Sequence, residues 1–321
     1  YGISSVVSLT DDMLIEQMRK YHSLNAGMQY VPITADDDDP RANRITAYLN
    51  LLNHLVSQQV DQLRQSPFEP GSEITRYYEM LPESPPKEQY RAMLEATDPE
   101  EKQKLQIKLR REVVPGSIDA NIMTKVDSLR DIHGAKPPPE YSDAKAALRG
   151  FARSEGLSSI VCSAGINSFL YKYFTNFKEF YPDENGEQRK KITIKVSDYR
   201  SAEFQGNFLA KLGLWVSEYR IESGLNCGGH AFPTKGLILG PILQVFLDKR
   251  DELRQRLYAT YRKALTAMGR TVPADPPESR LTVQGGIRTA EEDNLLHTYY
   301  QVDGTGWGTP LTDYPSLVGR A

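Results

Sequence analysis

The sequence predicts an α/β protein whose second half is a parallel (β/α) barrel. Six short apolar segments follow Pro115-Gly116, and segments with helical apolar spacing separate them. Glycine-rich turns follow the last two of these segments. Repeated strand-helix units are typical of a TIM-type (β/α)8 barrel or of an open doubly wound sheet. We expect the barrel, incomplete at its N-terminus and interrupted by a helical insertion.

The composition argues against several classes of protein. The 321 residues have 39 Lys and Arg against 42 Asp and Glu, a formal net charge of −3, and both signs are spread along the chain. This pattern gives no basic patch for nucleic acid or for an anionic membrane surface. No apolar run approaches the roughly 20 residues that span a bilayer. We therefore expect a cytoplasmic protein with a small-molecule substrate, and a homodimer is an open alternative.

Residues 1–40 are interpreted as an N-terminal segment of the barrel. The stretch 3–9 is rich in β-branched residues, which predicts a strand, and Thr10-Asp-Asp12 is a helix-cap signature before a helix over 13–21. Residues 30–34 contain a proline, which predicts an edge strand or a loop, and the acidic run 36–39 breaks regular structure.

Residues 41–114 are predicted to be a helical insertion or cap. Apolar residues recur there at helical spacing, and a second, charged helix pair follows the break at Pro67-Phe-Glu-Pro-Gly71. The block is too long for one barrel helix.

Residues 115–321 are predicted to hold the C-terminal strands of the barrel and a phosphate or flavin site. The expected strands are 118–125, 158–164, 192–196, 215–222, 281–284 and 302–307, and the expected helices are 144–155, 201–212, 242–268 and 290–299. The tyrosine-rich segment 171–181 is interpreted as surface at the barrel top or at an interface.

Two glycine-rich strand ends near the C-terminus predict a phosphate site. Gly285 and Gly286 follow one strand and precede a helix, and Gly304 to Thr309 follow about one βα unit later. Glycine lets the backbone approach a phosphate, whose charge is met by free N–H groups and by the helix dipole. In (β/α) barrels this site is typically formed after the seventh and eighth strands.

Several motifs follow one another in an order that matches a known family. These motifs are Ile118-Asp-Ala-Asn-Ile122, Ser159 to Gly165, Ile194-Lys-Val-Ser197, Gly228-Gly-His230, Gln284-Gly-Gly-Ile287 and Gly308-Thr309. Over residues 118–310 the sequence resembles the nitronate monooxygenase (2-nitropropane dioxygenase-like) branch of FMN-binding barrels, with kinship to enoyl reductases. The resemblance implies an FMN-dependent oxidoreductase for a small or apolar organic substrate.

The resemblance also implies roles for individual residues. His230 would be the catalytic acid/base or would orient the substrate, a task that suits an imidazole with an unperturbed pKa of about 6.5. The residues implied in cofactor binding are Asn121, Lys195, Gly228, Gly229, Gly285, Gly286, Gly308 and Thr309. Glu222, at the end of an expected strand, is a further candidate for hydrogen bonding to the flavin or substrate, and a helix cap or a loop-stabilising role is the open alternative.

Lys195 and a possible metal-ligand set can also be judged from the residues themselves. Lys195 lies in an apolar strand, so its ammonium should reach the barrel mouth or find an anion. Cys162, Cys227 and His230 all fall near strand ends, where three such ligands would suit zinc. Buried cysteine is commoner as a small hydrophobe, so we expect no metal.

Two other functions stay open at this point. A lyase or isomerase of a phosphorylated metabolite would need the same phosphate loops without a flavin. A noncatalytic, degenerate barrel would use the helical block as an interaction module.

Overall fold

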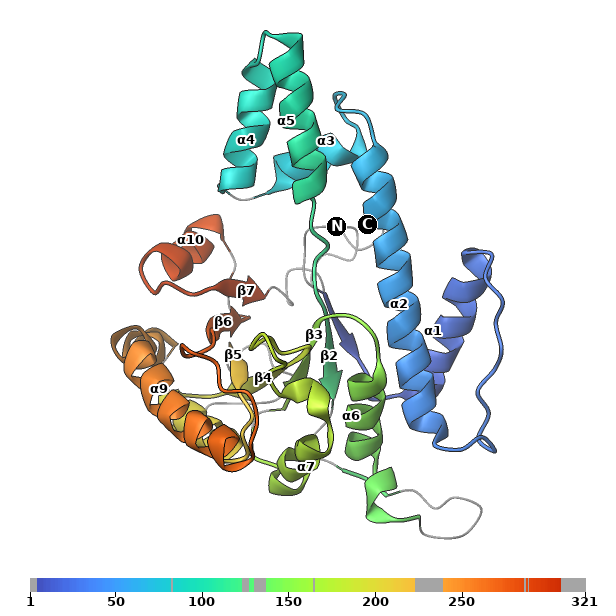
Figure 1. Ribbon diagram of the computed structural model, residues 1–321, viewed down its shortest axis with the longest axis vertical. Helices are drawn as coiled ribbons and strands as arrows, with labels where there is room; N and C mark the ends of the chain where they lie inside the picture. The colour runs from blue at the N-terminus through green and yellow to red at the C-terminus, as the bar shows by residue number, and fades with distance from the viewer. Residues whose placement is uncertain are drawn as a thin grey trace.

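The computed structural model describes residues 5–81, 83–122, 127–129, 137–163, 165–222, 239–285, 287 and 289–306. Within them, seven strands form a parallel sheet in which each strand pairs with its neighbours in the chain, in the order β1 to β7. The sheet curls through 228° into a half-barrel, and helices alternate with the strands (Figure 1). The prediction of an incomplete (β/α) barrel is confirmed.

The strands agree with the six predicted segments and with the strand predicted in the stretch 3–9. They are β1 (Ser5–Ser8), β2 (Ile118–Ile122), β3 (Ser158–Cys162), β4 (Lys190–Val196), β5 (Val216–Glu222), β6 (Arg280–Gln284) and β7 (Gly304–Gly306). Strand β1 belongs to the same sheet, because Ser5 pairs in register with Ile118 and Ser8 with Asn121.

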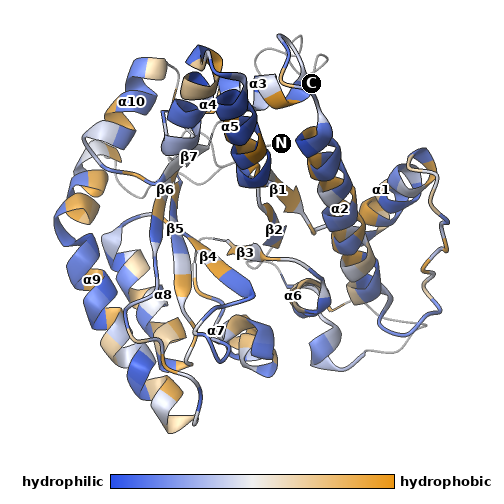
Figure 2. Ribbon diagram, turned by 45° about the horizontal axis from the view of Figure 1, so that its top comes forward, coloured by the Kyte–Doolittle hydropathy of each residue, from blue (hydrophilic) through white to orange (hydrophobic). Residues whose placement is uncertain are grey.

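Most of the helices lie around the outer side of the curled sheet, and the three helices within residues 73–112 stand apart from it (Figure 2). The helices are α1 (Asp12–Asn25), α2 (Pro40–Gln65), α3 (Glu73–Met80), α4 (Pro85–Glu95), α5 (Pro99–Glu112), α6 (Asp143–Arg153), α7 (Ser168–Tyr173), α8 (Tyr199–Lys211), α9 (Leu239–Ala267) and α10 (Ala290–Thr298). Among the described helices, none has the length and apolarity to cross a membrane.

The two faces of the sheet differ in chemistry because side chains alternate along each strand. Ile160, Ile194, Ile221 and Val283 point to the convex face and are fully buried with helix residues in the main core. The concave face holds the residues between them, and many of these are polar or charged. They include Asp119, Asn121, Ser159, Thr193, Lys195, Glu218, Arg220, Glu222, Thr282 and Gln284.

The helical block α3 to α5 has a small core of its own. Ile74 and Tyr78 are fully buried, and the Tyr78 ring stacks on Tyr90 with a centroid distance of 5.4 Å. The block lies between α2 and β2 in the chain, and α5 ends only a few residues before β2 begins. It therefore joins the half-barrel at the amino-terminal end of the strands.

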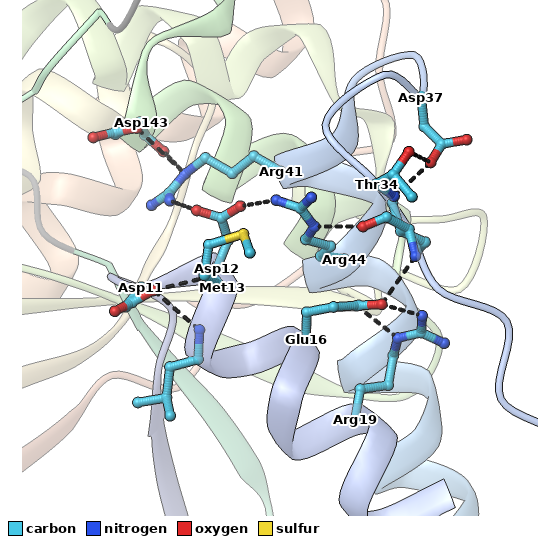
Figure 3. A network of polar contacts seen from close by, with 12 residues as sticks. Asp11, Asp12, Met13, Glu16, Arg19, Thr34, Asp37, Arg41, Arg44 and Asp143 are labelled. Atoms are coloured by element: carbon cyan, nitrogen blue, oxygen red, sulfur yellow. Dashed lines mark hydrogen bonds and ion pairs between the residues drawn. The ribbon is translucent and has the colours of Figure 1, made fainter.

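Buried ion pairs tie α1 and α2 together beside the end of β1 (Figure 3). Arg41 and Arg44 both contact the Asp12 carboxylate, at 2.6 and 2.7 Å. A second pair, Glu16 with Arg19 at 2.6 Å, lies within α1. Although burial opposes ionisation, the hydrogen bonds and charges of Arg44 and Arg41 lower the pKa of Asp12.

The prediction of an exposed tyrosine-rich segment at 171–181 is wrong. Tyr171, Phe174, Phe180 and Tyr181 are all buried in the main core. The Phe174 and Phe180 rings meet edge to face at 4.7 Å, and the Tyr171 hydroxyl satisfies its polar end with Gln205 at 2.7 Å. Tyrosine can be buried whole when its hydroxyl finds such a partner.

Candidate functional site

The carboxyl ends of β4 to β7 form the candidate site on the concave face. Four strands meet there side by side, and they contribute Lys195, Glu222, Gln284, Gly285 and Gly306 at or next to their last residues. In barrels with parallel strands this is the edge where ligands bind, because loops and helix N-termini gather at it.

Lys195 and Glu222 form an ion pair across neighbouring strands. The Lys195 Nζ to Glu222 Oε1 distance is 2.7 Å, and the two side chains are 20% and 13% exposed. The expectation that Lys195 finds an anion is thus confirmed. The pair holds an ammonium and a carboxylate at the mouth of the half-barrel with no net charge, and enough of each group is accessible for a ligand to contact it.

The two glycine-rich strand ends lie next to each other. Gly285 follows β6 with a φ of 78°, a conformation that favours glycine, and its N–H donates to the Gly306 carbonyl at 2.9 Å. A Cβ atom on Gly306 would lie 2.1 Å from Gln284 Oε1. Glycine at 306 therefore makes room for the Gln284 amide on the concave face.

The N-terminus of α10 lies beside these glycines and is already satisfied. Thr289 and Glu292 form a reciprocal capping box there. Glu291 and Asp293 add negative charge to the same turn, and Thr305 of β7 donates to Asp293 at 2.7 Å. The Gly285 N–H is engaged by the Gly306 carbonyl as well, so a phosphate at this edge would depend on donors other than the helix end and this amide.

Asn121 occupies another part of the same face. Its side chain is half-buried on β2, where Asn121 pairs in register with Val161, which in turn pairs with Thr193. Lys195 lies two residues beyond Thr193 on β4, so Asn121 and Lys195 point to the same side of the sheet. Asn121 can present its amide to a ligand that lies along the mouth.

The other predicted site residues lie outside the described part of the chain. These are His230, Gly228, Gly229, Gly286, Gly308 and Thr309. His230 belongs to the segment that connects β5 to α9.

Cys162 does not belong to the site. It is fully buried on the convex face of β3, and burial raises the pKa of its thiol to about 12. Such a thiol is unreactive, and its position is on the opposite side of the sheet from Lys195. The described residues contain no group of three potential metal ligands.

A buried polar network below the mouth was not predicted. Arg220 donates to Glu218 Oε1 at 2.8 Å, and Thr282 donates to the same oxygen at 2.6 Å. Asp119 lies 3.9 Å from Arg220. The signal was present in the sequence, because polar residues alternate at 119 and 121 and at 218, 220 and 222 within otherwise apolar strands.

No protein-family model, curated protein or solved structure matches this chain. The fold and the site define it as a parallel α/β half-barrel protein with a charged concave face.

Proposed function

We propose that this protein is an FMN-dependent oxidoreductase that acts on a small or apolar organic substrate. The observation that carries the proposal is the ion pair of Lys195 and Glu222, which shares the carboxyl edge with the glycine ends of β6 and β7. A fixed ammonium beside a polar, glycine-lined edge is what a phosphorylated, polar cofactor needs.

The residues of this edge fit FMN by their chemistry. Lys195 and the amides of Asn121 and Gln284 are donors for the polar edge of a flavin or for its ribityl chain. Gly285 takes a positive φ and Gly306 leaves room for the Gln284 side chain, so these glycines shape the edge at which the phosphate would be held. When bound, FMN supplies hydride or single-electron transfer, and the protein supplies binding and electrostatics.

The chain's own residues have separate tasks in this proposal. Glu222 holds the Lys195 side chain in one position, so that its ammonium stabilises negative charge that develops beside it. His230 gives a proton to the substrate or takes one from it. The polar edge orients the substrate, and a second substrate or an external reductant completes the electron balance.

The test is FMN binding by the purified protein, followed by absorption and by quenching of flavin fluorescence. We expect a yellow protein, and we expect Lys195→Met to weaken FMN binding about 10- to 100-fold, the value of a hydrogen bond to a charged group. Lys191→Met is the matched control, because Lys191 is an exposed lysine near the other end of the same strand.

A colourless protein that takes up no FMN would refute the proposal. Equal loss of affinity in the two lysine variants would show that Lys195 is not at the flavin. Binding of sugar phosphates without FMN would instead favour a lyase or isomerase of phosphorylated metabolites.

A further inference from the structure

Helix α1 turns its charged side inward and its apolar side to solvent. Its buried side chains, of which only Ile15 is large and apolar, are Asp12, Ile15, Glu16, Arg19 and Ser23. Its large apolar side chains on the other side are 37 to 63% exposed, and they are Met13, Leu14, Met18, Tyr21 and Leu24. A surface helix normally has the opposite arrangement, with its apolar stripe against the core. The outer side of α1 therefore has the character of an interface.

The exposed apolar side chains of α1 form one continuous stripe. At about 100° per residue, all five lie within an arc of about 140° around the helix axis. Leu14, Met18 and Tyr21 follow one another at steps of four and three residues, which is the spacing of a helix that packs along a second helix. Gln17 and Asn25 share the arc and are uncharged.

The charged residues at the border of the stripe are engaged within their own chain. The Lys20 Nζ lies 6.0 Å from the centroid of the Tyr30 ring. The Asp11 carboxylate caps the helix by accepting from the N–H groups of Met13 and Leu14 at 3.0 Å. The stripe itself is neutral, so two copies of it can pack together without bringing like charges into contact.

The stripe is accessible and large enough for a protein partner. Helix α1 lies at the outer edge of the molecule, with α2 on its inner side (Figure 1). Large side chains carry roughly 150 to 250 Å² each, so five that are about half exposed offer on the order of 500 Å². Specific interfaces bury roughly 600 to 1,000 Å² on each partner. The stripe and the polar residues at its border together reach this range.

We infer that two copies of this chain associate through α1, with the two helices antiparallel about a two-fold axis that passes between Gln17 and Met18. Leu14 of each copy then lies against Tyr21 of the other. Two-fold pairs are the commonest homo-oligomers, because one self-complementary patch serves both partners. A membrane surface fits less well, since helices that bind lipid present Lys and Arg on an exposed polar face, whereas the polar face of α1 is buried in ion pairs. The interface does not depend on the proposed function.

Sedimentation equilibrium of the purified protein over a dilution series tests the inference. We expect the mass of a dimer. Leu14→Glu or Tyr21→Glu should weaken association at least about 100-fold, because each substitution occurs twice in a two-fold pair and places a carboxylate in a neutral interface. Leu295→Glu is the matched control and should leave the dimer unchanged, because Leu295 lies on α10 and is 51% exposed, against 53% for Leu14.

A mixture of Leu14→Glu and Tyr21→Lys proteins tests the antiparallel arrangement. Each variant alone should be a monomer. The mixture should regain dimers, because the new carboxylate of one copy meets the new ammonium of the other. A mixture that stays monomeric would overturn the antiparallel arrangement.

Circular dichroism shows which variants are folded, and either α1 variant decides the test if the other does not fold. Three results would overturn the inference: a wild-type monomer at every concentration, a dimer that persists in a folded Leu14→Glu or Tyr21→Glu variant, or equal loss of the dimer in Leu295→Glu. Monomers that bind phosphatidylcholine vesicles through this stripe would assign it to a membrane instead.

Discussion

Lys190 gives the most quantitative prediction, because it is a fully buried ammonium among neutral acceptors. Its Nζ donates to the hydroxyls of Ser154 and Ser158 at 3.0 and 3.1 Å, and to the carbonyls of Glu155 and Gly156 at 3.2 and 3.1 Å. Burial lowers the pKa of Lys190 from 10.5 to about 8. This shift is worth about 3 kcal/mol, since one pKa unit corresponds to about 1.4 kcal/mol.

The sign of the effect follows from proton binding. Below pH 8 both the folded and the unfolded chain hold the proton on Lys190, so its contribution to stability does not change with pH. Between about pH 8 and 10.5 the folded chain has released this proton and the unfolded chain has not. The contribution of Lys190 to the free energy of unfolding must therefore rise with pH in that window.

The assay is urea unfolding of the wild-type protein and of Lys190→Met at several pH values from 7 to 11. Subtracting the two curves cancels the buried tyrosines, whose raised pKa values act in the opposite direction. We expect the wild-type free energy of unfolding to gain about 3 kcal/mol relative to the variant over this range. A difference that stays flat, or that falls with pH, would refute the reasoning.

Two further predictions concern the packing of the N-terminal helices. Gly150→Ala should lower the free energy of unfolding in urea by about 1 to 3 kcal/mol, because the new Cβ would lie 2.6 Å from the Ala42 carbonyl oxygen. An unchanged free energy of unfolding would mean that α2 and α6 can move apart at no cost. Asp12→Asn should cost about 3 kcal/mol at neutral pH by leaving Arg41 and Arg44 underpaired. The free energy of unfolding of the wild-type protein should exceed that of Asp12→Asn above about pH 4, and this difference should disappear as the pH falls through the lowered pKa of Asp12. A difference that persists at pH 2 would contradict the role given to the Asp12 carboxylate.

Sequence periodicity predicted the elements of this fold better than it predicted their contacts. The alternation of strands and helices after Pro115 was sufficient to expect a parallel barrel, and the charge of Lys195 was sufficient to expect an anion. Its partner Glu222 was named as a site residue, but the contact depends on the register of β4 against β5. That register shifts between Ile192 and Thr193, and no local pattern in either strand reports such a shift.

The surface prediction for the tyrosine-rich segment 171–181 was wrong because it, too, depended on a contact with a distant part of the chain. Its aromatic residues were assigned to the surface from composition, whereas burial depends on a hydroxyl partner elsewhere in the chain, which for Tyr171 is Gln205 in α8. Long-range partners of polar groups cannot be read from a single strand or helix. The charged concave face was not predicted either, although its polar residues alternate within β2 and β5 and could have indicated it.

Thr193 tests whether the described residues include every hydrogen-bond partner of the polar groups inside the half-barrel. Its side chain is fully buried on the concave face, and its hydroxyl has no partner among the described residues. Thr282 lies on the same face, and its hydroxyl donates to Glu218 at 2.6 Å.

Valine has nearly the shape of threonine without the hydroxyl, so the two substitutions should have opposite effects. We expect Thr193→Val to raise the free energy of unfolding by about 1 kcal/mol, because a buried unpaired hydroxyl is removed. Thr282→Val should lower it by about 2 kcal/mol, because a hydrogen bond to a carboxylate is lost. If Thr193→Val destabilises the protein as much as Thr282→Val does, the Thr193 hydroxyl must be bonded inside the half-barrel, and the concave face must be more completely filled than the described contacts imply.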